Sequence, residues 1–425
     1  MIKVAAGRAA IVLAGGALTL AGGLAPARAA SSAWRTDMTF AVRGDVSRFT
    51  DIAASSPADA WAIGFAVKTK GTSVPQPIIR HWTGRTWRLV ALPAKIGREL
   101  ARQGAALSVV SAASASNVFI FDSADDYLRL HGSRWSLGEL PGASQKSGAL
   151  VLIDASEAFS ATDVWAFGLR ISASGMAAPY AAQYSGRKWS RVTVPVLPGG
   201  GLITAVAAVS RGDIWAVELG FLPPPLAAAR AVAERWAVAA SPAARLAVAR
   251  LRAAASDSGA ASQVVLRWTA KTGWRDAAQQ PRLTATDQLV SGVAQPGGHV
   301  WFGGSADNSA NGTSPLTAEW NGSSWSVSDL PGKASSANWQ LTTMAPDGTG
   351  GIWALADDSN NDAERIWHLH GASWSQAKAA FGKHPWVLEA LALVPRTHSV
   401  WAAGVVQEGK SGADGLIAVD GALPR

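Results

Sequence analysis

The chain has 425 residues, of which 48% are hydrophobic and 16% charged, so it has enough apolar sequence for a large folded core. It contains no cysteine, which excludes disulfides, thiolate catalysis and cysteine-ligated metals. The formal net charge is +8, but the basic residues are dispersed and form no stripe with interleaved aromatics, so we expect no nucleic-acid partner.

The N-terminus has the order of features found in a secretory signal peptide. Basic residues precede an apolar stretch over residues 9–24, and the small-residue motif Ala27-Arg28-Ala29 follows it. We predict that residues 1–29 are a signal peptide, that residues 30–425 form a single domain, and that the protein is secreted. No later apolar run is long enough to span a bilayer, so no transmembrane segment is expected after signal removal.

A tryptophan phrase recurs along the rest of the chain, roughly every fifty residues. In its first copy, Asp59-Ala-Trp61-Ala-Ile-Gly64, an acidic residue precedes the tryptophan and a glycine follows it. Further copies place an aromatic residue at Phe119, Trp165, Trp215, Trp301, Trp353 and Trp401. A repeat of this length indicates stacked supersecondary units.

A second phrase follows each first one and predicts a hairpin. Its first copy runs from Trp82 through Gly84 to Trp87. Further copies centre on Gly132, Gly186, Gly322 and Gly371, with a looser one at Gly273. A polar residue and a glycine between two apolar alternating segments favour a tight turn with positive φ. One more apolar run precedes each first phrase, so each unit should contain four short strands.

Four antiparallel strands per repeat are typical of a β-propeller blade. We predict an all-β, seven-bladed propeller of four-stranded blades, in which the recurring tryptophans pack blade against blade. The last unit ends after a third strand near Asp420, whereas Trp34 lies on a strand that precedes the first unit. The N-terminal strand, within residues 34–42, should therefore close the last blade and remove two exposed sheet edges.

The interval from Trp215 to Trp301 is longer than the others and contains an Ala/Arg-rich segment, residues 222–258. Alanine and arginine favour helix, and Pro242 would separate two short helices. We predict a helical insertion in the fourth blade. Two alternatives stay open, namely an eroded eighth blade and a sequence artefact from translation out of frame in a GC-rich gene.

Candidate ligand contacts are tryptophans that the repeat does not explain. Most of the 20 tryptophans occupy repeat positions. Trp339 and Trp386 instead precede innermost strands, where their rings would reach the rim of a central channel. These two residues are the predicted ligand-binding candidates; no catalytic residue is assigned.

One segment resembles the start of a calcium loop, because Asp358, Asn360, Asp362 and Glu364 place oxygen ligands at alternate positions. The segment lacks the glycine and the late glutamate of an EF-hand, so a solvated polar loop is the competing interpretation. No cofactor is expected, and calcium at this segment is the alternative.

Two histidines, His368 and His370, lie on one face of a predicted strand, as a zinc pair would. His370 also stands immediately before a turn glycine, as His131 does. This second observation favours a role in the turn.

The two phrases resemble the repeats of secreted bacterial β-propeller proteins and are distantly similar to kelch and galactose-oxidase-type propellers. The resemblance covers about residues 33–421 and rests on structural motifs. Galactose oxidase needs a Cys-Tyr crosslink and copper ligands, whereas this chain has no cysteine and only 3 tyrosines. The resemblance therefore does not imply that active site.

These observations predict an exported, monomeric, non-enzymatic binding or scaffold protein. Its ligand would be a glycan, a peptide or a cell-envelope component. The partner that carries this ligand would be an extracellular protein or polysaccharide. The alternative is a propeller enzyme of lyase or glycosidase type with acidic residues at the central channel. Two carboxylates about 5–10 Å apart at the channel mouth would favour glycosidase chemistry, and a rim of aromatic and amide groups would favour binding.

Overall fold

The structure is a computed structural model that describes residues 33–42, 45–68, 74–123, 126–143, 149–220, 262–307, 312–331, 337–358, 363–408 and 412–423. These residues belong to one compact unit, Ala33–Arg425. The predicted signal peptide and the predicted insertion, residues 222–258, lie outside the described residues.

β-strands make up 67% of the described residues and pair in antiparallel groups of four. The innermost strands are β2 (Asp45–Ser56), β6 (Leu107–Ser114), β10 (Leu150–Ser160), β14 (Gly201–Ser210), β18 (Gln288–Gln295), β22 (Ala337–Pro346) and β27 (Trp386–Leu393). The second strands are β3 (Asp59–Lys68), β7 (Asn117–Asp122), β11 (Asp163–Ile171), β15 (Asp213–Gly220), β19 (His299–Asp307), β23 (Ile352–Asp358) and β28 (Val400–Glu408). Each group is named below after its innermost strand.

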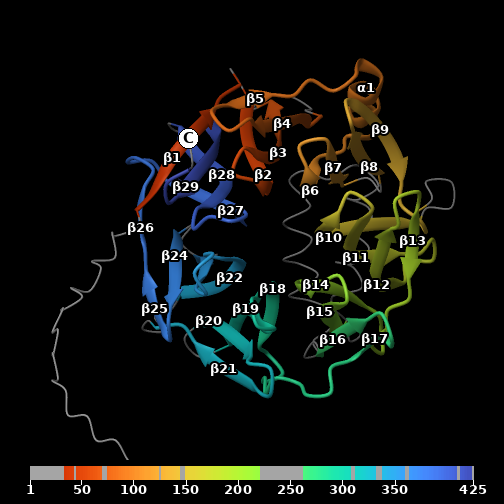
Figure 1. Cartoon of the computed structure of the whole chain (residues 1–425), viewed down its shortest axis with the longest axis vertical. Coiled ribbons are helices and arrows are strands. Elements are labelled where there is room, and N and C mark those ends of the chain that lie inside the picture. Colours follow the sequence, from red (N-terminus) through yellow and green to blue (C-terminus); the bar gives the residue numbers. More distant parts are fainter. Residues whose placement is uncertain are drawn as a thin grey trace, which may run out of the picture. The chain divides into compact units, whose positions relative to one another are not determined.

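The third strands are β4 (Gln76–Trp82), β8 (Asp126–His131), β12 (Ala177–Tyr184), β16 (Gln263–Thr269), β20 (Gly312–Trp320), β24 (Ala363–His370) and β29 (Gly412–Asp420). The fourth strands are β5 (Trp87–Leu89), β9 (Arg134–Glu139), β13 (Trp189–Val192), β17 (Gly273–Asp276), β21 (Trp325–Asp329), β25 (Ser373–Gln376) and β1 (Ala33–Phe40). Within this unit the groups follow one another around a circle in chain order (Figure 1), and β27 contacts β2. This arrangement confirms the all-β, propeller-like part of the predicted fold class.

The first strand of the described chain pairs with the last. β1 runs antiparallel to β29, from Arg35 opposite Val419 to Phe40 opposite Gly415. The short strand β26 (Lys378–Ala380) pairs in parallel with the other edge of β1. This pairing confirms the prediction that the N-terminal strand completes the sheet of the C-terminal unit.

The glycine of the first phrase has a steric cause. The innermost strand β2 breaks register between Phe49 and Asp51, next to Gly64 on β3, which marks a β-bulge. A Cβ atom on Gly64 would lie 1.9 Å from the carbonyl oxygen of Arg48. The corresponding contacts are 2.0 Å at Gly168, 1.7 Å at Gly304 and 2.0 Å at Gly404. In these four groups the backbone of the innermost strand therefore leaves no room for a side chain at the facing glycine.

The repeat tryptophans pack between neighbouring groups. Trp401 of the β27 group is fully buried and meets Trp82 and Trp87 of the β2 group edge-on, with ring centroids 5.3 and 5.1 Å apart. Trp61 in turn lies edge-on to Trp135 of the β6 group at 6.1 Å. Large aromatic side chains at one strand position thus fill the space between sheets, as the sequence predicted.

A helix that the sequence analysis did not predict, α1 (Ala94–Gln103), follows β5. It buries Ile96 and Leu100, one turn apart, and ends at Gly104, whose φ of 64° is left-handed. Among the described residues, no helix combines the length and hydrophobicity needed to cross a membrane.

Candidate functional site

A cavity of about 580 Å³ lies between innermost strands of the ring. Most of its lining comes from β2, β6, β10 and β27, and alanine, serine and threonine predominate there. Small side chains keep the space between the strands open, and its volume falls within the range of ligand pockets. The charged residues that line it are Arg48, Asp51, Asp154, Glu157 and Glu389.

Three of these charged groups connect neighbouring strands. Arg48 of β2 forms an ion pair with Glu389 of β27. Asp51 accepts hydrogen bonds from the backbone N–H of Ile52, at 2.8 Å, and from that of Val110 on β6, at 2.7 Å. These contacts fix the position of β2 relative to both of its neighbours.

Glu157 of β10 has a strongly perturbed carboxyl group. Its side chain reaches solvent in the cavity, yet protein surrounds it, and the resulting desolvation raises its pKa to about 7. The neighbouring hydroxyls of Ser111 and Ser156 are 2.9 Å apart and also line the cavity. Near neutral pH, Glu157 can therefore hold or release a proton.

The cavity does not have the aromatic and amide rim that would indicate a sugar-binding site. Phe65 is the one aromatic residue among the described residues that line it, and they include no histidine. The sequence analysis anticipated acidic residues at the channel but did not single out Asp51, Asp154, Glu157 or Glu389. They come from separate repeats, and only ring closure brings them together.

The two predicted ligand-binding tryptophans lie away from the cavity lining. Trp339 of β22 is buried, and the guanidinium carbon of Arg365 lies 4.1 Å from the centroid of its ring. Trp386 of β27 is half-buried and packs edge-on against Phe381, with centroids 4.9 Å apart. Both rings have packing partners, and a role in ligand binding stays a prediction.

The predicted calcium loop is described only at its two ends. Oδ1 of Asp358 accepts the Asn338 backbone N–H at 3.0 Å, and Oε2 of Glu364 accepts the Leu388 backbone N–H at 2.7 Å. Burial raises the pKa of Glu364 well above its usual value. Asn360 and Asp362 lie outside the described residues, so a calcium site formed by the four stays a prediction.

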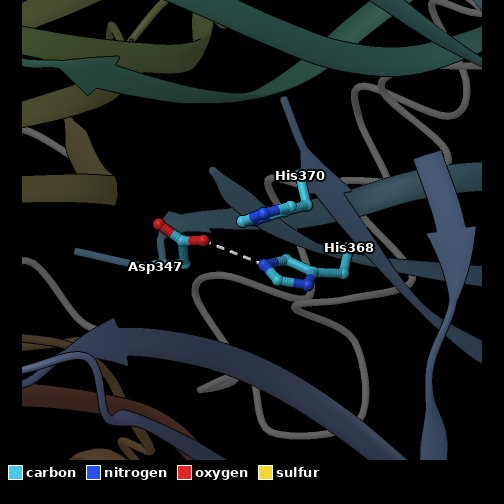
Figure 2. Close-up of side chains that lie close together, drawn as sticks. All are labelled: Asp347, His368 and His370. Atoms are coloured by element: carbon cyan, nitrogen blue, oxygen red, sulfur yellow. Dashed lines mark hydrogen bonds and ion pairs between the residues drawn. The ribbon is translucent and has the colours of Figure 1, made fainter. Parts of the chain in front are cut away.

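A cluster of metal-ligating side chains occurs in the β22 group. Asp347, His368 and His370 each offer a ligand atom within 4.8 Å of the others. Figure 2 shows both imidazoles on the strand beside Asp347, with His368 bonded to the carboxylate. The sequence analysis identified the two histidines but missed Asp347, which precedes β23 in a turn.

Hydrogen bonds fix the carboxylate of Asp347. Oδ2 lies 2.9 Å from Nε2 of His368 and accepts the Thr349 hydroxyl at 2.7 Å. Oδ1 accepts the backbone N–H of Thr349 at 2.7 Å and that of Gly351 at 2.8 Å. Burial opposes ionisation, but these hydrogen bonds together hold the pKa of Asp347 below its usual value.

The Asp–His pair has a counterpart elsewhere in the repeat. Nε2 of His81 lies 2.7 Å from Oδ1 of Asp59, and the His81 ring stacks on Trp61 at 4.1 Å, much as His368 stacks on Trp353 at 3.9 Å. Pairs at matching positions are Gln183 with Asp163, Arg267 with Asp213 and Glu319 with His299. The pair is thus a structural part of the repeat, and His370 is the additional donor.

Glu218 of β15 takes the place that Gly64 has on β3. Its side chain is fully buried, and Oε1 accepts the Leu197 backbone N–H at 2.9 Å. Oε2 has no hydrogen-bond partner among the described residues. Burial raises the pKa of this carboxyl group to about 7.

Replacing Glu218 with glutamine should remove a pH-dependent loss of stability. The folded-state pKa lies above the unfolded value, so the folded protein binds the proton more tightly and loses stability as pH rises towards 7. From pH 5 to pH 8 this loss is about 2 kcal/mol, which Glu218→Gln should abolish. Urea denaturation at both pH values measures it. The exposed control Glu139→Gln should behave as wild type, and an unchanged pH dependence in Glu218→Gln would contradict the argument.

No protein-family model matches the sequence, and the search of curated proteins found no match. Solved structures are similar in fold. YCF48 bound to D1 peptide is 12% identical, with 91% of this chain and 94% of that chain covered and a TM-score of 0.51. A puromycin-hydrolyzing peptidase from Mycobacterium tuberculosis is 11% identical, with 87% of this chain and 50% of that chain covered and a TM-score of 0.51. At these identities the likeness shows the fold alone, a β-propeller-like one.

Proposed function

We propose that the protein is a non-enzymatic binding propeller whose cavity holds a cationic group, such as a lysine or arginine side chain of a peptide. The charge of the cavity carries this proposal. Four carboxyl groups and one guanidinium line it, and that guanidinium, on Arg48, is ion-paired with Glu389. An entering cation would meet a surplus of acidic groups in a partly enclosed space, where electrostatic attraction is stronger than in bulk water.

The fold is compatible with a peptide ligand. A structural neighbour, YCF48, was solved with a bound D1 peptide. In this chain the small side chains of β2, β6 and β10 leave room for an extended segment, and the acidic groups would select its basic residue. The partner would then be an extracellular protein with an exposed basic segment.

The proposal includes export and a ring of seven blades formed by a monomer. Export is supported by the leader-like residues 1–29. Seven blades are supported by the order of contacts between innermost strands, which run from β2 through β27 and back to β2 among the described residues. Mass spectrometry of the exported chain tests the cleavage site, and sedimentation tests the oligomeric state.

A lyase or glycosidase function is the alternative, and Glu157 is the observation in its favour. A carboxyl group with a pKa of about 7 suits a general acid at neutral pH. Under this alternative a ligand would be converted to product, and Glu157→Gln would stop its conversion while leaving binding intact.

Affinity for a cationic ligand should rise about tenfold between pH 6 and pH 8, because Glu157 becomes charged as pH passes about 7. The probe is a set of acetylated hexapeptides with one central lysine, measured by calorimetry against the same peptides with norleucine. Glu157→Gln should bind the lysine peptides with the wild type's pH 6 affinity at both pH values. The exposed control Glu139→Gln should retain the increase in affinity between pH 6 and pH 8. Equal affinity for the lysine and norleucine peptides would refute a cation-binding cavity.

A further inference from the structure

We propose that Asp347, His368 and His370 form a binding site for a divalent transition-metal ion of the zinc class. The three side chains supply one carboxylate oxygen and two imidazole nitrogens, a ligand set that zinc commonly takes. Their ligand atoms already lie within 4.8 Å of one another. This site is separate from the cavity and does not depend on the proposed binding function.

The ligands are held by rigid elements. His368 and His370 are two residues apart on β24, so both project from the same face of the strand (Figure 2). The ring of His368 is stacked on Trp353 at 3.9 Å. The carboxylate of Asp347 is oriented by Thr349 and Gly351, which donate to both of its oxygens. Fixed ligand orientation of this kind favours metal binding.

A metal ion can enter with little rearrangement. Nε2 of His368 and Oδ2 of Asp347 are 2.9 Å apart. Two tetrahedral zinc ligands with ordinary bond lengths lie about 3.4 Å apart, so the pair must open by about half an ångström. The metal would take the Oδ2 lone pair that now accepts from His368, and the imidazole would carry its hydrogen on Nδ1. His370 is exposed and can turn to complete three protein ligands, which leaves a fourth position for water.

A second carboxylate near the cluster would help to compensate the charge of the ion. Asp420 of β29 is 4% exposed, and its Oδ1 has no hydrogen-bond partner among the described residues. Its charge acts on both His368 and Asp347, which places it close to the ligands. The carboxyl group of Asp420 also accepts the backbone N–H of Gly421, so only Oδ1 lacks a partner among the described residues. A buried carboxylate oxygen without a hydrogen bond is costly in an apolar environment, and a nearby divalent cation would reduce this cost.

The related pair in the β2 group provides an internal comparison. Asp59 and His81 are bonded and stacked on Trp61 in the same manner, but Thr83 stands where the β22 group has His370. A pair without the third donor should bind zinc weakly. His370 therefore distinguishes a metal site from a structural pair.

The test is titration of the tag-free exported chain with Zn²⁺ and with Co²⁺, followed by calorimetry and by the visible absorption of bound cobalt. We expect one ion per chain at the cluster. His370→Ala should weaken binding at least tenfold, since even loss of a supporting group costs about 10- to 100-fold. Because His370 is exposed and lies outside the structural pair, its loss should leave the melting temperature in EDTA unchanged.

Two further variants keep the test decisive. His370→Gln retains a polar residue before the turn glycine and should also lose the cobalt spectrum, even if His370→Ala folds poorly. His81→Ala removes a histidine of the related pair and should bind zinc as wild type does. Wild-type affinity in both His370 variants, or no binding of Zn²⁺ and Co²⁺ by the intact chain, would overturn the proposal.

Discussion

Replacing Gly64 with alanine is expected to lower the free energy of unfolding by about 3 kcal/mol or more. The new Cβ would lie 1.9 Å from the carbonyl oxygen of Arg48 and 2.7 Å from the Cα of Phe49. Both are backbone atoms of the bulged strand β2, so no rotation of a side chain relieves the contact. Strand β2 must move, and its contacts with β6 and β27 would move with it. The measurement is the midpoint of urea denaturation together with the yield of soluble protein.

Gly97 provides the matched control. It lies within α1, and a Cβ there would meet no atom within 4 Å. Gly97→Ala should therefore stabilise the protein by about 0.5–1 kcal/mol, because alanine is the better helix former. If Gly64→Ala unfolded at the same denaturant concentration as wild type, the contact with the Arg48 carbonyl would not require glycine at this position.

The repeat predicted the strands well because each strand is specified locally by its own alternation and turn. The phrase around Trp61 also contained Gly64 and Asp59, but their roles depend on atoms from other strands. Gly64 is needed because the Arg48 carbonyl of β2 lies against it, and Asp59 binds His81 on β4. A register shift and a cross-strand pair leave no periodic signal in one sequence. The helix α1 was missed because only Ile96 and Leu100 give it a buried side.

The candidate sites were less predictable for the same reason. Glu157 looks like an ordinary polar residue of an innermost strand, and only the protein that surrounds the cavity desolvates it and raises its pKa. Asp347 precedes His368 by a whole turn and strand, so no short motif connects them. Most tryptophans were predicted to pack between blades, and two were predicted to contact a ligand, which stays a prediction. Trp339 and Trp386, which the repeat did not explain, have partners in Arg365 and Phe381.

Replacing Trp34 with alanine should destabilise the protein by about 3–5 kcal/mol, the usual loss for a large buried aromatic side chain. Trp34 is fully buried, with 0% of its surface accessible to solvent, and its ring meets that of Trp353 edge-on at 5.3 Å. It thereby anchors β1 against the β22 group, while β1 completes the sheet of β29. The midpoint of urea denaturation, followed by tryptophan fluorescence, measures the loss.

Two controls separate anchoring of the N-terminal strand from a general effect of lost apolar area. Trp34→Phe keeps an aromatic ring against Trp353 and should lose less than half as much stability as Trp34→Ala. Leu89→Ala removes a side chain on β5 that is 59% exposed and should change stability by less than about 0.5 kcal/mol.

In Trp34→Ala, protection of β29 amides from hydrogen exchange should fall before that of β11, because β1 is the strand that pairs with the outer edge of β29. Equal loss of protection in β29 and β11 would mean that Trp34 supports the whole ring and not its closing strand.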